Sequence, residues 1–202
     1  MARMRSRTII GALVVVLALG GLGIYIAEQP AIGSVAPDSA FGGGNYTLET
    51  GSGKPFTEAS LAGAPTMLFF GYTHCPDVCP TTMADMALWF HELGPEGKAL
   101  RAFFVSVDPS RDTPAVLGDY VKAVSDRITG VTGSPAEVDK IEQAWGIYAA
   151  KVPAADGGDD YTMNHTATVY LVDSKGRFQG TIAYQEDDAT ALKKLRNLIA
   201  KG

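Results

Sequence analysis

The chain has only two cysteines, Cys75 and Cys79, and they stand close together. Both lie in the run Gly71-Tyr-Thr-His-Cys-Pro-Asp-Val-Cys-Pro80, directly after the apolar segment 65–70. Two thiols at this spacing can close a disulfide, exchange disulfides with another molecule, or bind a soft metal ion. Dithiol oxidoreductases of the thioredoxin type place two residues between their cysteines, whereas this pair has three. The wider spacing suits a disulfide and a shared metal ion equally well.

A helix is predicted to follow the cysteines at residues 81–93, where Met83, Met86 and Phe90 recur at helical spacing. Pro80 fits the first turn of that helix, because the N–H that proline lacks has no partner there. Both sulfurs are therefore expected in the loop that leads into the helix. The helix N-terminus is electropositive, which lowers the pKa of a nearby thiol and favours the thiolate.

Three histidines could add an imidazole ligand. His74 adjoins Cys75, but neighbouring side chains on an extended segment point in opposite directions. His91 falls late in the predicted helix and is expected to be solvated or to cap it. His165 precedes an apolar run, at a junction that would face the cysteine loop in a thioredoxin-like fold. Spacing alone favours an ordinary surface histidine at that position.

The pattern along the chain predicts alternating strands and helices. The segment 173–176, Asp-Ser-Lys-Gly, predicts a hairpin between the last two strands. Strands are expected at 45–48, 66–70, 102–107, 128–132, 166–172 and 178–184, and further helices at 113–124, 135–144 and 187–200. A βαβ unit with a dithiol at its first strand-to-helix junction, followed by a hairpin and a terminal helix, is typical of a thioredoxin-like α/β domain. Such a domain has a central mixed sheet flanked by helices.

The N-terminus predicts a membrane anchor. Residues 1–8 carry three arginines, and residues 9–27 are an uncharged apolar stretch just long enough to span a bilayer as a helix. The arginines place the N-terminus in the cytoplasm. A cleaved signal peptide is the alternative, but the junctions after Ala27 and Ala36 suit cleavage poorly.

Either alternative exports the remainder of the chain. Residues 28–44 are rich in Gly, Pro, Ala and Ser and are expected to form a flexible linker to a single domain at 45–202. Outside the cytoplasm disulfides persist, so a reductant must keep the cysteine pair reduced if it is to bind metal. The net charge of −5 and the absence of a basic patch argue against nucleic acid as a partner.

Three motifs together resemble the SCO/SenC family, membrane-anchored copper proteins that help to assemble cytochrome c oxidase. They are the cysteine run 71–80, Val105-Ser-Val-Asp-Pro109 with Arg111-Asp-Thr-Pro114, and the His165 segment followed by Tyr170-Leu-Val-Asp173. The resemblance covers the chain from about Phe41 onwards. It implies that Cys75, Cys79 and His165 are the three protein ligands of one copper ion, Cu(I) or Cu(II).

The resemblance also gives expectations for the charged residues around the site. Asp77 matches an aspartate between the cysteines of the family, either an outer-sphere neighbour and occasional Cu(II) ligand or simply a turn-forming residue. Asp108, Arg111 and Asp112 match the second motif, and we expect these charges to fix the loop near the site.

Two functions follow from the resemblance and the dithiol. The first is a metallochaperone in a bacterial inner membrane, with its domain on the periplasmic side. It would take copper from an upstream periplasmic donor, depend on a thiol reductant, and deliver copper to the dinuclear site of the oxidase copper-site subunit. The second is a thiol–disulfide reductase or redox sensor that acts through Cys75 and Cys79. No catalytic residue is predicted for the first function, and only the first needs His165.

Overall fold

A computed structural model describes residues 41–154 and 160–201. The predicted cytoplasmic N-terminus 1–8, the anchor 9–27 and residues 28–40 of the predicted linker 28–44 lie outside the described residues. Within the described part of the chain, no helix has both the length and the apolar character needed to cross a membrane.

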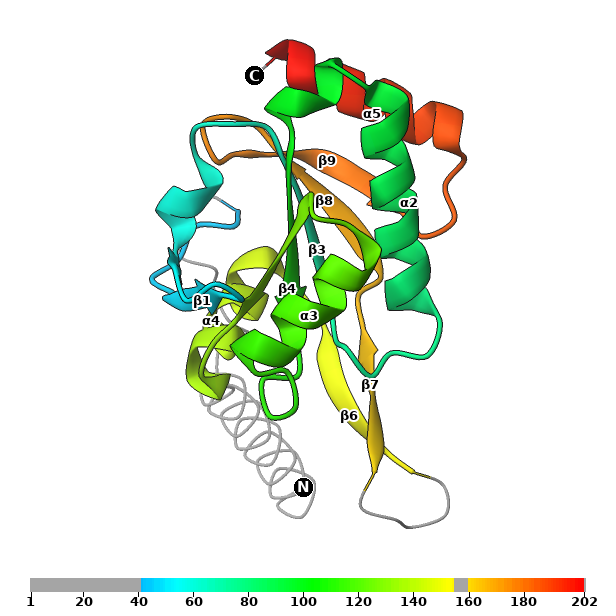
Figure 1. The fold of residues 1–202 in the computed structure, drawn as a ribbon. Helices are drawn as coiled ribbons and strands as arrows, with labels where there is room; N and C mark the ends of the chain where they lie inside the picture. Colours follow the sequence, from blue (N-terminus) through cyan, green and yellow to red (C-terminus); the bar gives the residue numbers. More distant parts are fainter. Residues whose placement is uncertain (1–40, 155–159, 202) are drawn as a thin grey trace, which may run out of the picture. The chain divides into compact units, whose positions relative to one another are not determined.

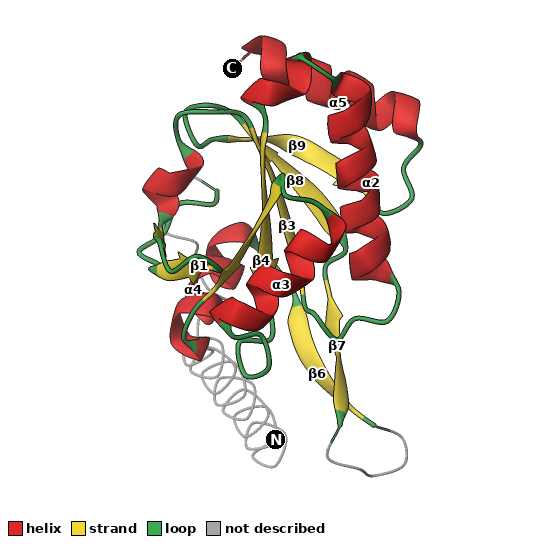
Figure 2. Ribbon diagram, in the orientation of Figure 1, coloured by secondary structure: helices red, strands yellow, loops and turns green. Residues whose placement is uncertain are grey.

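A mixed sheet of seven strands forms the centre of the domain (Figures 1 and 2). Its strand order is β2-β1-β5-β4-β3-β8-β9. The three central strands β3, β4 and β5 are parallel, and every other pairing is antiparallel. The strands are β1 (Leu48–Thr50), β2 (Pro55–Phe56), β3 (Thr66–Gly71), β4 (Arg101–Ser106), β5 (Ile128–Thr132), β8 (Thr168–Val172) and β9 (Phe178–Ala183). The predicted mixed α/β architecture is confirmed, although the first strand starts at Leu48, where the prediction had it end.

The helices begin where local sequence favours initiation. The hydroxyls of Thr113 and Ser134 each accept a hydrogen bond from a backbone N–H in the first turn, and a proline follows each of them at the first helical position. The helices are α2 (Val78–Leu93), α3 (Pro114–Val124), α4 (Pro135–Trp145) and α5 (Asp188–Lys201), with short 3-10 turns at Glu58–Leu61 and Glu96–Ala99. All four of these helices were predicted, and each of their bounds lies within three residues of the prediction.

Helices cover both faces of the sheet, and aromatic side chains of β3 pack in both directions. Phe69 contacts Phe104, against which α3 packs, with 5.8 Å between the ring centroids. Its neighbour Phe70 contacts Tyr170, against which α4 packs through Trp145. Because successive strand residues point to opposite faces, α3 and α4 lie on opposite sides of the sheet. The continuous apolar run of β3 is thus explained by burial on both faces.

A second, two-stranded sheet was not predicted. Strand β6 (Ala149–Pro153) pairs antiparallel with β7 (Tyr161–His165), and this hairpin extends away from the main sheet (Figure 1). His165 was expected in a loop before the next strand, but it is the last residue of β7. That next strand, β8, begins at Thr168 rather than at the predicted residue 166. The hairpin therefore carries the histidine that the sequence singled out.

Candidate metal centre

The two cysteines occupy different structural elements. Cys75 lies in the loop between β3 and α2, as predicted, but Cys79 is the second residue of α2. The prediction that both sulfurs lie in the loop was therefore wrong for Cys79, because α2 begins at Val78 and not at 81. The earlier start is compatible with Pro80, since the first N–H groups of a helix have no intrahelical acceptor.

The fold brings Cys75, Cys79 and His165 together. One potential ligand atom from each residue lies within 4.8 Å of the other two. The Cys79 sulfur is 3.4 Å from His165 Nε2, and the Cys79 backbone N–H donates to the Cys75 sulfur over 3.4 Å. Cys79 is buried, whereas the other two residues are half-buried. Among the described residues, these three form the one Cys/His/Asp/Glu group of this kind, although His165 is 86 positions from Cys79.

The imidazole of His165 is oriented for coordination. Its Nδ1 lies 3.2 Å from the backbone carbonyl oxygen of Thr166, which can only accept a hydrogen bond. The proton therefore belongs on Nδ1, and the lone pair of Nε2 faces the sulfurs. The ring edge packs against Tyr72, with 5.7 Å between centroids and an interplanar angle of 89°. This contact restricts rotation of the ring.

The thiol pair is electrostatically asymmetric. A hydrogen bond from the Cys79 side chain lowers the pKa of Cys75 from 9.0 to about 4, with further help from backbone N–H groups of Cys79 and Asp77. The same hydrogen bond, together with burial, raises the pKa of Cys79. The metal-free reduced pair therefore holds one thiolate at Cys75 and one thiol at Cys79 near neutral pH. This low pKa agrees with the expectation for a thiol near a helix N-terminus.

Gly71 makes room for the Cys79 sulfur. A Cβ at this last residue of β3 would lie 2.7 Å from Cys79 Sγ and 2.8 Å from the ring of Phe104. Neither neighbour can withdraw easily, because both are fully buried. The glycine that opens the cysteine motif is thus needed for the close approach of α2 to the sheet.

The loop after β4 holds the cysteine loop in place. The buried carboxylate of Asp112 accepts hydrogen bonds from the Thr73 hydroxyl at 2.6 Å, the Thr73 backbone N–H at 3.1 Å and the Ser106 hydroxyl at 2.6 Å. Thr73 lies two residues before Cys75. Asp112 therefore anchors the segment that presents the first sulfur.

The same loop also holds the hairpin. Asp108, 1% exposed, accepts a hydrogen bond from the Tyr161 hydroxyl at 2.7 Å and pairs with Arg111. Arg111 in turn donates to the Tyr161 carbonyl at 2.9 Å, and its guanidinium lies 3.7 Å from the centroid of the Tyr161 ring. Tyr161 begins the strand that ends at His165. The expectation that Asp108, Arg111 and Asp112 fix the surroundings of the site is thus confirmed, and these residues position both halves of it.

The remaining candidates lie outside the ligand group. His74 is exposed and its Nδ1 lies 3.0 Å from the Thr73 hydroxyl, and His91 is exposed in the last turn of α2. Asp77 is exposed at the residue before α2, and its carboxylate accepts a hydrogen bond from the Thr81 hydroxyl at 3.5 Å. This contact fits a turn-forming aspartate, although Asp77 also lines the hollow beside the cysteines.

A hollow of about 290 Å³ opens beside Cys75 and His165. Residues of the cysteine loop and of the hairpin line it. One of them, Met163, is a methionine that the sequence analysis missed. The lining residues are Tyr72, Cys75, Pro76, Asp77, Val78, Thr162, Met163, Asn164, His165 and Ala167. The alternation of Tyr161, Met163 and His165 with exposed Thr162 and Asn164 was the available signal, since it is the period of a half-buried strand.

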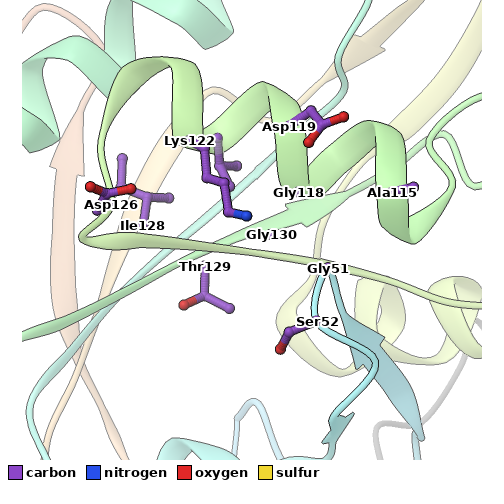
Figure 3. A pocket seen from close by; sticks show the side chains of 11 residues that line it. Gly51, Ser52, Ala115, Gly118, Asp119, Lys122, Asp126, Ile128, Thr129 and Gly130 are labelled. Carbon is purple, nitrogen blue, oxygen red and sulfur yellow. The ribbon is translucent and has the colours of Figure 1, made fainter.

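A larger hollow of about 440 Å³ lies elsewhere, between α3, β5 and the turn after β1 (Figure 3). Asp119, Lys122 and Asp126 carry the charged side chains of its lining. Because neither cysteine nor His165 takes part, this hollow has no connection with the metal centre.

Two thiolates and an imidazole are ligands that suit copper and zinc. The described residues therefore define a metal-binding α/β domain, with a dithiol at a strand-to-helix junction and a histidine delivered by a hairpin. Comparison with known proteins identifies the family. Residues 35–200 match the SCO1/SenC family model, and the chain belongs to this family.

Curated relatives support this assignment. The chain is 33% identical over 173 residues to the mitochondrial protein SCO2 of Saccharomyces cerevisiae, covering 85% of this chain and 58% of the yeast protein. It is 36% identical over 141 residues to the human mitochondrial SCO1 homolog, covering 67% of this chain and 46% of the human protein. The chain thus spans about half the length of these relatives.

Solved structures of Sco proteins share the fold. Bradyrhizobium japonicum ScoI with copper bound has 40% identity and a TM-score of 0.70, covering 77% of this chain and 98% of that one. Yeast Sco1 with copper bound has 32% identity and a TM-score of 0.72, covering 79% of this chain and 89% of that one. The fold is therefore the thioredoxin-like fold of Sco proteins. Relatives have been solved with copper, and this chain has a Cys-Cys-His group that could bind one metal ion.

Proposed function

We propose that this protein is a membrane-anchored metallochaperone that binds one copper ion through Cys75, Cys79 and His165. The observation that carries the proposal is the convergence of two sulfurs and an imidazole nitrogen within 4.8 Å at a half-buried position. The copper bound in the related structures supports the choice of metal. Thiolate ligands also favour Cu(I), the softer oxidation state.

The three residues contribute in different ways. Cys75 offers a thiolate without losing a proton, because its pKa is low. Cys79 has a raised pKa and gives up its proton when the ion binds, so binding releases a proton near neutral pH. His165 supplies Nε2 from a separate element, the hairpin. The half-buried setting leaves one side of the site open to an acceptor.

Delivery is proposed to occur by ligand exchange. Thiolates and imidazoles of the cytochrome c oxidase copper-site subunit would replace this protein's ligands one at a time, so that no free ion is released. The protein would receive its copper from a periplasmic donor, and a periplasmic reductant would keep Cys75 and Cys79 reduced. Residues 9–27 would hold the domain at the periplasmic face of the inner membrane.

Substitution His165→Ala tests the copper site. We expect the variant to lose tight copper binding in titrations of the reduced protein, monitored by thiolate-to-Cu(II) absorbance, while the Cys75–Cys79 disulfide still forms. The exposed His91 provides the matched control, and His91→Ala should bind copper like the unaltered protein. Unchanged copper stoichiometry and affinity in His165→Ala would contradict the proposal.

A second candidate function is disulfide reduction, favoured by the low pKa of Cys75. The Cys75 thiolate would attack a disulfide of the oxidase copper-site subunit, and Cys79 would resolve the mixed disulfide. The protein would leave as a Cys75–Cys79 disulfide, and the substrate as a dithiol. Catalytic reduction of an oxidised peptide from that subunit by the metal-free protein, with a reductant present, would establish this activity. The two functions are compatible, because Cu(I) binding requires the reduced pair.

A further inference from the structure

Met163 lies on the face of β7 that carries His165. Tyr161, Met163 and His165 are half-buried, whereas the intervening Thr162 and Asn164 are exposed. Residues two apart on a strand point to the same side. The thioether of Met163 and the imidazole of His165 therefore project from one face of the hairpin.

The hollow beside the cysteines runs along β7, and residues 162–165 all line it. Met163, His165 and Cys75 all line the same 290 Å³ space, and Met163 also packs against the apolar core. The Met163 backbone is hydrogen-bonded to the Tyr72 hydroxyl, which ties this part of β7 to the segment that leads into the cysteine loop. Met163 is thus held at the rim of the metal centre by main-chain and side-chain contacts.

We propose that the thioether of Met163 is a fourth ligand for Cu(I) at this centre. The inference rests on the proposed copper-binding function and extends its ligand set. A thioether is a soft donor that selects Cu(I), and it carries no proton to lose. Its long, flexible side chain suits a weak fourth bond that opens when an acceptor approaches.

Asp77 is the competing donor at the same hollow. A carboxylate is a hard ligand and suits Cu(II) better than Cu(I). The two residues should therefore prefer different oxidation states of copper: Met163 should bind Cu(I), and Asp77 should bind Cu(II). This contrast gives a matched pair of variants, Met163→Leu and Asp77→Asn.

The direct test is X-ray absorption at the selenium edge of the selenomethionine-labelled protein loaded with Cu(I). The chain has six methionines, so Met163→Leu retains five selenium atoms as an internal control. We expect copper scattering around selenium in the unaltered sequence and none in Met163→Leu. Leucine nearly conserves the volume of methionine, so the variant should fold.

Affinity provides the second measurement. In competition with a chromophoric Cu(I) chelator, Met163→Leu should bind Cu(I) about tenfold more weakly, a loss of about 1.4 kcal/mol. Its Cu(II) affinity should stay unchanged. Asp77→Asn should retain the Cu(I) affinity, which shows that the loss is specific to the thioether.

The outcomes separate the inference from the proposed function. Full Cu(I) binding without copper scattering at selenium, or an unchanged Cu(I) affinity in Met163→Leu, would overturn the role of Met163 and leave the three-ligand site intact. Failure of the unaltered reduced protein to bind copper at all would overturn the proposed function and the inference with it.

Discussion

At the scale of single residues, the hydrogen bond between the two thiols determines their chemistry. It lowers the pKa of Cys75 to about 4 and raises that of Cys79. The reduced pair carries one negative charge and not two, because two adjacent thiolates would repel each other. The pair therefore titrates as a unit, and removing either sulfur changes the other.

Substitution Cys79→Ala should raise the pKa of Cys75 towards its ordinary value of 9.0. The variant removes the main hydrogen-bond donor to the Cys75 sulfur, so the thiolate is destabilised relative to the thiol. In the unaltered protein Cys75 is fully ionised between about pH 6 and pH 8, and its alkylation rate should be flat there. In Cys79→Ala the rate should climb about tenfold per pH unit, in proportion to the thiolate fraction.

The measurement is the pH dependence of alkylation of the metal-free reduced protein, with the site of modification identified by mass spectrometry. Substitution His74→Ala is the control, since His74 is exposed and adjoins Cys75 without joining the ligand group. A steep pH dependence already present in the unaltered protein would refute the low pKa of Cys75.

The proposed ligands differ in how far the sequence alone identified them. Cys75 and Cys79 were identified from their types and spacing, which are local features. His165 was assigned only through family resemblance, because its contact with Cys79 spans 86 positions and depends on the whole fold. Met163 was missed entirely, since a methionine on a short strand is normally core packing until its neighbours are known.

At the scale of elements, the loop between β4 and α3 sets the relative position of the two halves of the site. Asp112 holds the cysteine loop through Thr73, and Asp108 with Arg111 holds β7 through Tyr161. The hairpin β6–β7 is not hydrogen-bonded into the seven-stranded sheet. Side-chain contacts of this kind therefore act together with the short connection from His165 to β8 to set the distance between His165 and the sulfurs.

Substitution Tyr161→Phe should loosen the hairpin and weaken copper binding. It leaves buried Asp108 without one hydrogen-bond donor, at an expected cost of about 1 to 3 kcal/mol in the free energy of unfolding. Faster hydrogen exchange confined to the hairpin amides, together with a lower copper affinity, would identify a positioning role.

Tyr148→Phe is the matched control, because Tyr148 stands just before β6 with 60% of its surface exposed. It should change neither hydrogen exchange nor copper affinity. If Tyr161→Phe destabilised the whole domain evenly and kept full copper affinity, Tyr161 would be only a structural residue.

Most elements of the main sheet were predicted, with the exception of the short strand β2, whereas the hairpin was not predicted. Strand β3 is a continuous buried apolar run, and the four helices carry buried apolar residues at helical spacing; both patterns are signals that sequence analysis detects. Strands β6 and β7 contain no fully buried residue, so the only burial pattern in their sequence is the weak alternation along β7. The sequence between them, residues 154–160, contains Asp156-Gly157-Gly158, a hairpin turn signal that the sequence analysis did not use.

At the scale of the whole molecule, the site lies where the chain leaves the central parallel strands. The cysteine loop follows the carboxyl end of β3, and the loop with Asp108 and Asp112 follows that of β4. Parallel strands in register bring their carboxyl ends to one edge of the sheet, which is where open α/β sheets place their ligand sites. Strand β8 runs antiparallel to β3, so its first residue lies at the same edge of the sheet as the carboxyl end of β3. His165 comes just before β8 and therefore reaches the same edge.

A copper ion at this position would connect the hairpin to the cysteine loop and to helix α2, which directly follows that loop. Binding to the folded state alone stabilises it by mass action, by about 2.7 kcal/mol when free copper is a hundredfold above the dissociation constant. For a domain of this size, that corresponds to a rise of roughly 5 to 10 °C in Tm.

His165→Ala should lose most of this rise in Tm, because the copper ion no longer links the hairpin to the cysteines. Thermal unfolding of the two reduced proteins, with Cu(I) buffered by a chelator, measures the rise in Tm of each. An equal rise in the two proteins would mean that the ion is held by the cysteine loop alone, and that the hairpin is not part of the binding unit.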